Sequence, residues 1–186
     1  MNKFHLRKKI LKIRKKNFNK NLKININSFI SFLKLNTGSA NNLGGYYPSN
    51  YEIDDLEILG LLEKKKFKIS LPIIKKNNQM DFFKWSNNDP LKINQFGIPE
   101  PTSSKKIYPD ILLVPLVAYD NHLNRLGYGG GFYDRTLKEL LIINKHTASI
   151  GLAFESQKCN KLPKNNFDVP LNSLLNEKGF LHFKNI

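Results

Sequence analysis

Two neighbouring stretches of this sequence indicate its architecture: Asp110-Ile-Leu-Leu-Val114 and the glycine-rich segment Arg125-Leu-Gly-Tyr-Gly-Gly-Gly-Phe-Tyr-Asp-Arg135. A short run of consecutive apolar residues, such as 111–114, is typical of a strand covered on both faces of a sheet. The glycine-rich segment is followed by a helical pattern over Thr136–Ile143 and by a second buried strand over Ala148–Phe154. Strands that alternate with helices in this way predict an α/β domain with a mainly parallel sheet.

The N-terminal part of the chain is also expected to contain both helices and strands. We predict a basic amphipathic helix over residues 3–17, where apolar residues recur at helical spacing. The acids of Glu52-Ile-Asp-Asp-Leu-Glu57 favour a helix start there, with Asn50 as the candidate cap, and this helix should end at residues 64–66. The other expected elements are a helix over 22–35 and strands over 43–47, 67–74, 80–85 and 180–183.

Residues 86–108 are polar and contain three prolines, Pro90, Pro99 and Pro101, so we expect a long loop there. The sequence shows neither an internal repeat nor a linker. We therefore predict a single three-layer α/β domain over residues 1–186, with the basic amphipathic helix at its N-terminal end.

Composition narrows the classes of protein to which the chain can belong. With 186 residues and 40% hydrophobic residues, it can bury a substantial core, which excludes wholesale disorder. The longest apolar run, 111–119, is too short to span a membrane and contains a proline. The single cysteine, Cys159, excludes an intrachain disulfide and a cysteine zinc cluster. We expect a monomeric cytoplasmic protein that binds neither membranes nor nucleic acid.

The positive charge is concentrated near the N-terminus. The net charge is +15, and residues 1–51 hold 11 basic residues and no acidic one. This asymmetry indicates a polyanionic partner, either a nucleic acid, an anionic surface or a small polyanion. The alternative is a solvated helix face in a lysine-rich chain.

The glycine-rich segment is the strongest candidate for a binding site. A run of glycines between a buried strand and a helix lets backbone N–H groups close around a phosphate, although it can also be merely a tight turn. Arg125 and Arg135 bracket it, in a chain with 4 Arg and 26 Lys, and arginine binds phosphate in a bidentate manner. Asp134 is a candidate ligand for Mg²⁺; the alternative is an acid that stabilises the helix N-terminus.

The segments 109–120 and 125–134 together resemble the 5-formyltetrahydrofolate cyclo-ligase family. The resemblance extends along the chain through Lys3-x-x-Leu-Arg7, Tyr46-Tyr-Pro-x-x-x-Glu52, Gly97-Ile-Pro-Glu-Pro101 and Phe167-Asp168. It implies an ATP- and Mg²⁺-dependent enzyme that converts 5-formyltetrahydrofolate into 5,10-methenyltetrahydrofolate, ADP and phosphate. The formyl oxygen would take the γ-phosphoryl group, and the N10 nitrogen of the folate would then displace phosphate.

The resemblance also assigns roles to residues. The catalytic residues it implies are Arg125, Tyr133 and Asp134, and the Mg²⁺ ligands are Asp134 and Asp168. The implied ATP contacts are Lys3, Phe4, His5, Leu6, Arg7, Arg125, Leu126, Gly127, Tyr128, Gly129, Gly130, Gly131, Phe132 and Tyr133. The implied folate contacts are Tyr47, Glu52, Phe96, Tyr128, Gly129, Gly130, Gly131 and Phe132.

Some of these residues have simpler interpretations. Glu52 can also be an acid in the first turn of a helix, and Phe96 can be an anchor into the core. Tyr133 has the same two interpretations as Phe96. Tyr128 stands where some relatives carry a basic or other side chain, so the phosphate charge must be neutralised by other residues. Two other functions remain open: a small RNA-binding protein that uses the N-terminal arm, and an α/β enzyme that binds a sugar phosphate without ATP.

Overall fold

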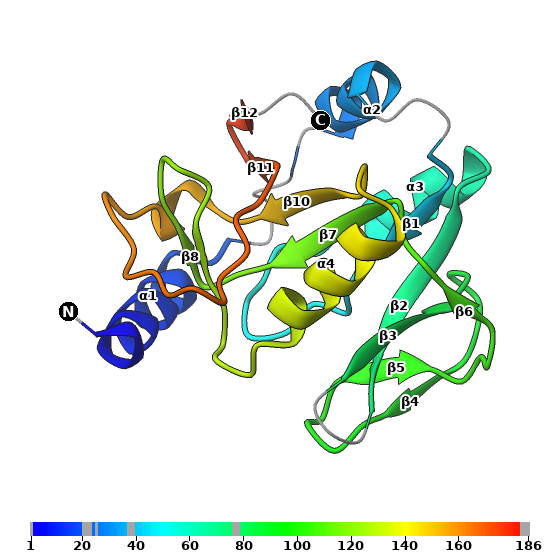
Figure 1. Ribbon diagram of the computed structural model, residues 1–186, viewed down its shortest axis with the longest axis horizontal. Coiled ribbons are helices and arrows are strands. Elements are labelled where there is room, and N and C mark those ends of the chain that lie inside the picture. Colours follow the sequence, from blue (N-terminus) through cyan, green and yellow to red (C-terminus); the bar gives the residue numbers. More distant parts are fainter. Residues whose placement is uncertain (1, 20–23, 25, 37–39, 76–78, 183–186) are drawn as a thin grey trace.

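The computed structural model describes residues 2–19, 24, 26–36, 40–75 and 79–182. Its elements, shown in Figure 1, alternate between strands and helices along the chain. The helices are α1 (Lys3–Asn17), α2 (Ile26–Asn36), α3 (Leu56–Lys64), α4 (Phe132–Ile143) and the 3₁₀ turn η2 (Glu155–Gln157). The strands are β1 (Asn42–Gly44), β2 (Lys68–Ile74), β3 (Met80–Lys84), β4 (Leu91–Ile93), β5 (Pro99–Pro101), β6 (Lys106–Ile107), β7 (Ile111–Pro115), β8 (Ala118–Tyr119), β9 (Arg125–Leu126), β10 (Ala148–Leu152), β11 (Ser173–Asn176) and β12 (Gly179–His182).

One sheet of eight strands forms the centre, in the order β12-β11-β10-β7-β1-β2-β3-β6. Strands β11, β10, β7, β1 and β2 are mutually parallel, and β12, β3 and β6 are added antiparallel at the two edges. The predicted α/β class with a mainly parallel sheet is thus confirmed. The run 111–114 is fully buried, as expected for the central strand β7.

Helices cover both faces of the sheet, which gives three layers. Apolar residues of α2 and α3 pack with Leu43, Ile111 and Leu113 on one face. Leu137 and Leu140 of α4 pack with Leu112 and Val114 on the other face, the one turned toward the viewer in Figure 1. Because neighbouring residues of a strand point to opposite faces, β7 contributes to both cores.

Helix α1 packs at the end of the sheet rather than on a face. Asn2 caps it, since its side chain accepts a hydrogen bond from the backbone N–H of His5 (3.0 Å). Leu6 and Ile10 pack against Val117 and Leu126, in the segments that follow the carboxyl end of β7. The predicted helix over 3–17 is confirmed, and its apolar stripe holds it across this end of the sheet.

The prediction of a long loop over residues 86–108 is wrong. Strands β4 and β5 form a hairpin, and β6 joins the edge of the main sheet. The side chain of Asn94 closes the hairpin turn by accepting the N–H groups of Phe96 and Ile98, and Gly97 supplies a positive φ of 74°. Prolines are tolerated because a two-stranded ribbon leaves backbone positions without a partner strand.

Several element boundaries also differ from the sequence prediction. Helix α3 begins at Leu56 with Asp55 at the cap position, so neither Asn50 as cap nor Glu52 as helix start is correct. Helix α4 begins four residues earlier than predicted, directly after the glycine run. The strands β8, β9 and β11 were not predicted, and β1 and β10 are shorter than predicted. Of the helix predicted over 22–35, residues 22, 23 and 25 lie outside the described residues, as does residue 183 of the last strand.

Candidate active site

The proposed functional residues gather at the carboxyl ends of β1 and β7. Numbered among themselves along the chain, the five parallel strands lie in the order 2-1-3-4-5, so the chain reverses its direction of winding between β1 and β7. The crevice outside the carboxyl ends at such a reversal is the usual ligand site of an open α/β sheet. Here it is bordered by residues 45–55 after β1 and by the glycine loop, residues 127–131, ahead of α4.

Three positions of this loop favour glycine, for two different physical reasons. Gly129 and Gly131 have φ values of 112° and 67°, which side-chain-bearing residues rarely adopt. At Gly130, a Cβ would lie 2.5 Å from the ring of Phe132. A Cβ on Gly127 would meet open space. The loop therefore needs glycine at 129, 130 and 131 for its shape, whatever it binds.

All four arginines of the sequence contact the segment 125–131 or belong to it. The Nε atom of Arg7 donates to the carbonyl oxygen of Gly127 (2.7 Å), and Nη2 of Arg135 donates to that of Gly130 (2.8 Å). Arg14 contacts Tyr128, as described below, and Arg125 opens the segment. The scarce arginines are thus brought together at the glycine-rich segment.

Arg125 and Asp134 form a partly buried ion pair. Nη2 of Arg125 lies 2.8 Å from Oδ1 of Asp134, which also accepts the backbone N–H of Val169 (3.0 Å). Nη1 of Arg125 donates to the carbonyl oxygen of Val169. Burial lowers the pKa of Arg125, although Asp134 and Asp168 counteract this. The Arg125 side chain is only 4% exposed and is therefore not turned to solvent in this conformation.

Asp168 lies in the same neighbourhood and pairs with Lys3 of α1, whose Nζ is 2.6 Å from Oδ2. Burial would raise the pKa of Asp168, but hydrogen bonds from Lys3 and the Asn165 amide outweigh it, and the pKa is lowered. Within the described part of the chain, no group of three or more His, Cys, Asp or Glu residues could hold a metal ion. A metal at Asp134 and Asp168 would therefore need oxygens from a ligand as well.

Glu52 is buried, with 8% exposure, and sits in the segment after β1. Its Oε1 accepts the Tyr128 hydroxyl (2.5 Å), and Oε2 accepts the backbone N–H of Ser49 (2.7 Å). Burial raises the pKa of Glu52, because it outweighs these hydrogen bonds and the charge of Arg14. Since α3 starts only at Leu56, the interpretation of Glu52 as a first-turn helix acid is wrong.

Arg14 was missed by the sequence analysis. Its side chain is buried (1% exposed) and follows Leu6 and Ile10 at intervals of four residues on the inner face of α1. Nη2 donates to the Tyr128 hydroxyl (2.5 Å) and Nη1 to the carbonyl oxygen of Leu116 (3.1 Å). The signal that could have found it is an arginine in a lysine-rich chain at a position where the helix spacing calls for an apolar residue.

Aromatic side chains lie beside the loop. The rings of Phe96 and Phe132 are edge to face, with centroids 6.3 Å apart, although they come from the β4–β5 hairpin and the start of α4. Phe96 is 53% exposed, so it is not the core anchor that was considered. Tyr133 packs partly against the core under α4, and burial raises the pKa of its hydroxyl well above the ordinary value.

The other predicted contacts differ in how they are placed. Leu6 and Leu126 have buried side chains that pack together in the core under α1. Phe4 is 67% exposed, and its ring contacts His5, whose own side chain is exposed. Tyr47 is half-buried in the segment after β1. In this conformation, Leu6 and Leu126 could therefore contact a ligand only through their backbone atoms.

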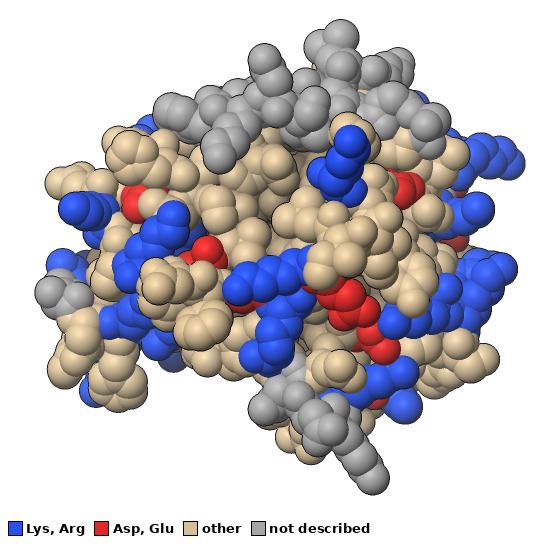
Figure 2. Space-filling view, in the orientation of Figure 1, with Lys and Arg blue, Asp and Glu red and all other residues tan. Residues whose placement is uncertain are grey.

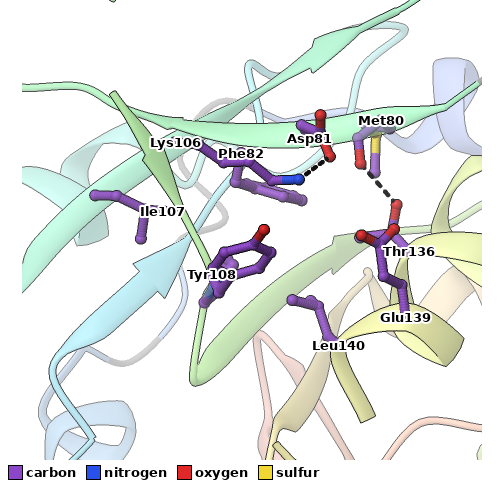
Figure 3. A pocket seen from close by; sticks show the side chains of 10 residues that line it. Met80, Asp81, Phe82, Lys106, Ile107, Tyr108, Thr136, Glu139 and Leu140 are labelled. Atoms are coloured by element: carbon purple, nitrogen blue, oxygen red, sulfur yellow. Dashed lines mark hydrogen bonds and ion pairs between the residues drawn. The ribbon is translucent and has the colours of Figure 1, made fainter. Parts of the chain in front are cut away.

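A small cavity of about 10 Å³ lies elsewhere, between α4 and the edge strands β3 and β6. Figure 3 shows Lys106 paired with Asp81 (2.8 Å) and the Thr136 hydroxyl donating to the carbonyl oxygen of Met80 (3.1 Å) beside it. This volume holds at most a water molecule, and none of the predicted site residues lines it. It is therefore not the ligand site.

The basic excess does not form a single surface patch on the face shown in Figure 2, where lysines and arginines cover both flanks and acidic residues are interspersed. Part of the N-terminal charge faces inward, since Arg14 is buried and Lys3 is paired. Of the helices described, none has the length and apolar character to cross a bilayer.

Comparison with known proteins identifies related sequences. The model of the 5-formyltetrahydrofolate cyclo-ligase family matches residues 1–177. The 5-formyltetrahydrofolate cyclo-ligase of Haemophilus influenzae is 37% identical over 73% of this chain and 75% of its own length. The Escherichia coli protein of the same name is 32% identical over 64% of this chain and 69% of its own length.

Solved structures show the same fold. The structure of 5,10-methenyltetrahydrofolate synthetase from Aquifex aeolicus aligns with a TM-score of 0.77 and 28% identity, over 98% of this chain and 93% of that one. The synthetase from Mycoplasma pneumoniae aligns with a TM-score of 0.71 and 23% identity, over 95% of this chain and 99% of that one, which supports the fold alone. Because the family model extends over nearly the whole sequence, this chain belongs to the 5-formyltetrahydrofolate cyclo-ligase family.

Proposed function

We propose that this protein uses ATP and Mg²⁺ to convert 5-formyltetrahydrofolate into 5,10-methenyltetrahydrofolate, with release of ADP and phosphate. Membership of the family gives the reaction class. The observation that carries the proposal is the contact between Tyr128 of the glycine loop and Glu52, which joins the expected phosphate-binding and folate-binding segments at one end of the sheet. Neither the family match nor the relatives support the RNA-binding alternative.

The chemistry requires two successive displacements. The formyl oxygen attacks the γ-phosphorus of ATP, and ADP leaves. N10 of the folate then attacks the activated formyl carbon, the carbon–oxygen bond breaks, and phosphate departs with the former formyl oxygen while N10 loses its proton. Such phosphoryl transfer depends on alignment and charge neutralisation more than on a protein nucleophile.

The nucleotide phosphates are proposed to bind at the glycine loop. Backbone N–H groups of residues 129–131 sit at the N-terminus of α4, where the helix dipole favours anions. Arg7 and Arg135 approach the loop from α1 and α4 and supply positive charge. These two arginines would neutralise phosphate charge, which the uncharged side chain of Tyr128 would not.

Arg125 is proposed to act through Asp134 rather than on the phosphates. Its guanidinium is occupied by Asp134 and by the carbonyl oxygen of Val169. It therefore holds the first turn of α4 against the segment around Asp168 and fixes the orientation of the Asp134 carboxylate. We treat it as a positioning residue for the carboxylates.

Mg²⁺ fits Asp134 and Asp168. Each carboxylate is bonded through one oxygen, Oδ1 of Asp134 and Oδ2 of Asp168, and among the described residues the other oxygen has no hydrogen bond. Mg²⁺ in phosphoryl-transfer sites is typically held by one or two carboxylates together with substrate phosphates. When bound, the ion would neutralise charge on the phosphates.

The folate is proposed to lie between Glu52 and the aromatic pair. A buried carboxylate is suited to accept hydrogen bonds from the amino and ring N–H groups of the pterin. The exposed ring of Phe96 and the half-buried ring of Phe132 offer surface for an aromatic part of the ligand. Tyr128 bonds to Glu52, and Tyr47 lies in the same segment after β1 as Glu52.

One sheet runs through residues 42–182, which supports treating residues 1–186 as one domain.

The test is to mix the purified protein with 5-formyltetrahydrofolate and MgATP and to follow methenyltetrahydrofolate by its absorbance. We expect product only when ATP and a divalent metal are both present. Asp134→Asn, which keeps the oxygen that accepts from Arg125, should fold but lose at least about a hundredfold in kcat across a Mg²⁺ titration. Unchanged kinetics in this variant would remove Asp134 from the metal site.

A further inference from the structure

Arg14 is the one arginine to which the proposed binding of nucleotide and metal assigns no role. It lies on the inner face of α1, and its side chain is among the largest fully buried ones in the protein. No carboxylate pairs with it directly among the described residues, and its Nε atom has no hydrogen-bond partner there. A buried cation in that state is costly, so its presence calls for an explanation.

The hydrogen bonds of Arg14 lead to Glu52 through one intermediate. Nη2 of Arg14 donates to the Tyr128 hydroxyl, which in turn donates to Oε1 of Glu52. Both hydrogen bonds have a donor–acceptor distance of 2.5 Å. The guanidinium also lies 5.7 Å from the centroid of the Tyr128 ring. This chain joins three segments that are far apart in the sequence: α1, the glycine loop and the segment after β1. The tyrosine hydroxyl can bridge them because it accepts and donates at once.

The groups around Glu52 explain why a cation is needed there. Tyr128 of the glycine loop bonds to it, and Tyr46 and Asp55 of its own segment and Tyr133 of α4 interact with it electrostatically. None of these groups is cationic, and burial raises the pKa of Glu52. The positive charge of Arg14 works in the opposite direction, together with the hydrogen bonds from Tyr128 and Ser49.

We propose that Arg14 is a positioning residue that, through the Tyr128 hydroxyl, holds Glu52 as an oriented carboxylate for the N–H groups of the folate pterin. The idea rests on the proposed function, because it assumes that Glu52 binds folate. Arg14 itself touches neither the substrate nor the nucleotide in this account. The carboxylate is a stronger acceptor than the protonated acid, so folate affinity should depend on Arg14 only while Glu52 is present.

The rival explanation is that Arg14 merely anchors α1 to the sheet through its bond to the Leu116 carbonyl oxygen (3.1 Å). In that case, removal of Arg14 would lower stability and would change folate affinity equally whether or not Glu52 is present. A double-mutant cycle separates the two explanations, because it measures the energetic coupling between the two side chains.

The experiment measures Kd for 5-formyltetrahydrofolate by calorimetry, as a function of pH, in the parent, Arg14→Met, Glu52→Gln and the double variant. We expect Arg14→Met to weaken binding roughly tenfold or more in the parent background and less than about threefold in the Glu52→Gln background. Loss of the cation should raise the pKa of Glu52, so the acid-side loss of affinity should begin at a higher pH in Arg14→Met. Equal effects in both backgrounds, with an unshifted pH profile, would overturn the proposal.

Two further variants guard the interpretation. Tyr128→Phe deletes only the bridging oxygen, so it provides the same cycle with Glu52→Gln if Arg14→Met does not fold. Lys12→Met removes one positive charge from the exposed side of α1 and should leave Kd and its pH profile unchanged. If the parent does not bind 5-formyltetrahydrofolate, the proposed function fails and this inference with it; if it binds and the cycles are additive, only the inference fails.

Discussion

In the glycine loop, three neighbouring residues are glycine for reasons of backbone conformation or of packing space. Gly129 and Gly131 take positive φ angles, and Gly130 leaves space for the Phe132 ring. Gly131 is also the cap position of α4, so the turn that exposes the backbone N–H groups is the turn that starts the helix. Substitutions in the loop should therefore change both the stability of the fold and the shape of the proposed anion site, in proportions that depend on the position.

Gly129→Ala should weaken nucleotide binding more than it weakens the fold. Its φ of 112° is strained for alanine, and the new Cβ would lie 3.4 Å from the Arg7 guanidinium carbon, in ordinary contact. We expect a stability loss of about 1–2 kcal/mol and a fall in ATP affinity of more than about tenfold. Thermal unfolding and calorimetric titration with MgATP measure the two effects. Normal ATP affinity in a destabilised variant would reduce the glycines to a tight turn.

Asp55 should make stability depend on pH. It is completely buried, Oδ2 accepts the Tyr46 N–H (3.0 Å), and Oδ1 has no partner among the described residues. Burial raises its pKa well above the ordinary value. A carboxyl with a raised pKa in the folded state favours folding at low pH, and this contribution is lost as the pH rises through the folded-state pKa.

Asp55→Asn tests this sign directly. The amide keeps an acceptor for the Tyr46 N–H but cannot ionise. The free energy of unfolding of the variant, relative to the parent, should therefore increase as the pH rises from acid to neutral. Urea unfolding across that range provides the measurement, and parallel curves for the two proteins would show that Asp55 does not titrate in the way described.

Among the helices and strands, the apolar pattern of the sequence predicted the elements whose buried faces determine their residue types. β7 and β10 were predicted because strands covered on both faces are continuously apolar, and α1 because its buried stripe follows the helical period. The β4–β5 hairpin was missed because its short strands are polar and contain prolines, and its turn depends on the Asn94 side chain. β11 was missed although it is buried, since its four residues give too short a pattern.

The candidate site was predictable only in part for a related reason. The glycine run and the scarce arginines Arg7, Arg125 and Arg135 are visible in the sequence, because their chemistry is local. The bond between Tyr128 and Glu52 joins residues 76 positions apart and exists only because β1 and β7 are neighbours in the sheet. Arg14 looked like one more basic residue of α1, and only the packing of the helix shows that it faces inward.

Helix α3 contains a glycine without an evident packing role. A Cβ on Gly60 would meet nothing within 4 Å, and the residue has no positive φ. Gly60→Ala should therefore raise the free energy of unfolding by about 0.5–1 kcal/mol, because alanine loses less backbone entropy in a helix. It also serves as the glycine-to-alanine control for Gly129→Ala.

Gly45→Ala, just after the end of β1, should change stability in the opposite direction. There the added Cβ would lie 2.5 Å from Leu59 and 2.8 Å from the Asp55 carboxylate, so the variant should be less stable than the parent. Urea unfolding of both variants tests the pair. A destabilised Gly60→Ala would mean that α3 is packed more tightly at this position than its open surroundings indicate.

For the molecule as a whole, α1 is the element that connects the segments of the candidate site. It reaches three different segments, through Lys3 to Asp168, Arg7 to Gly127 and Arg14 to Tyr128. The sheet brings the glycine loop and the Glu52 segment to one end, and α1 lies across that end with its basic residues. This internal role accounts for three of the 11 basic residues in the N-terminal part of the chain.

In the proposed reaction, the formyl oxygen of the folate becomes an oxygen of the released phosphate. The most direct test supplies 5-formyltetrahydrofolate with a heavy oxygen isotope in its formyl group, together with MgATP and the parent protein, and examines the phosphate by mass spectrometry. The proposed reaction predicts one labelled oxygen in each phosphate released, in step with the appearance of methenyltetrahydrofolate. Phosphate without the label, or phosphate released without methenyltetrahydrofolate, would contradict it.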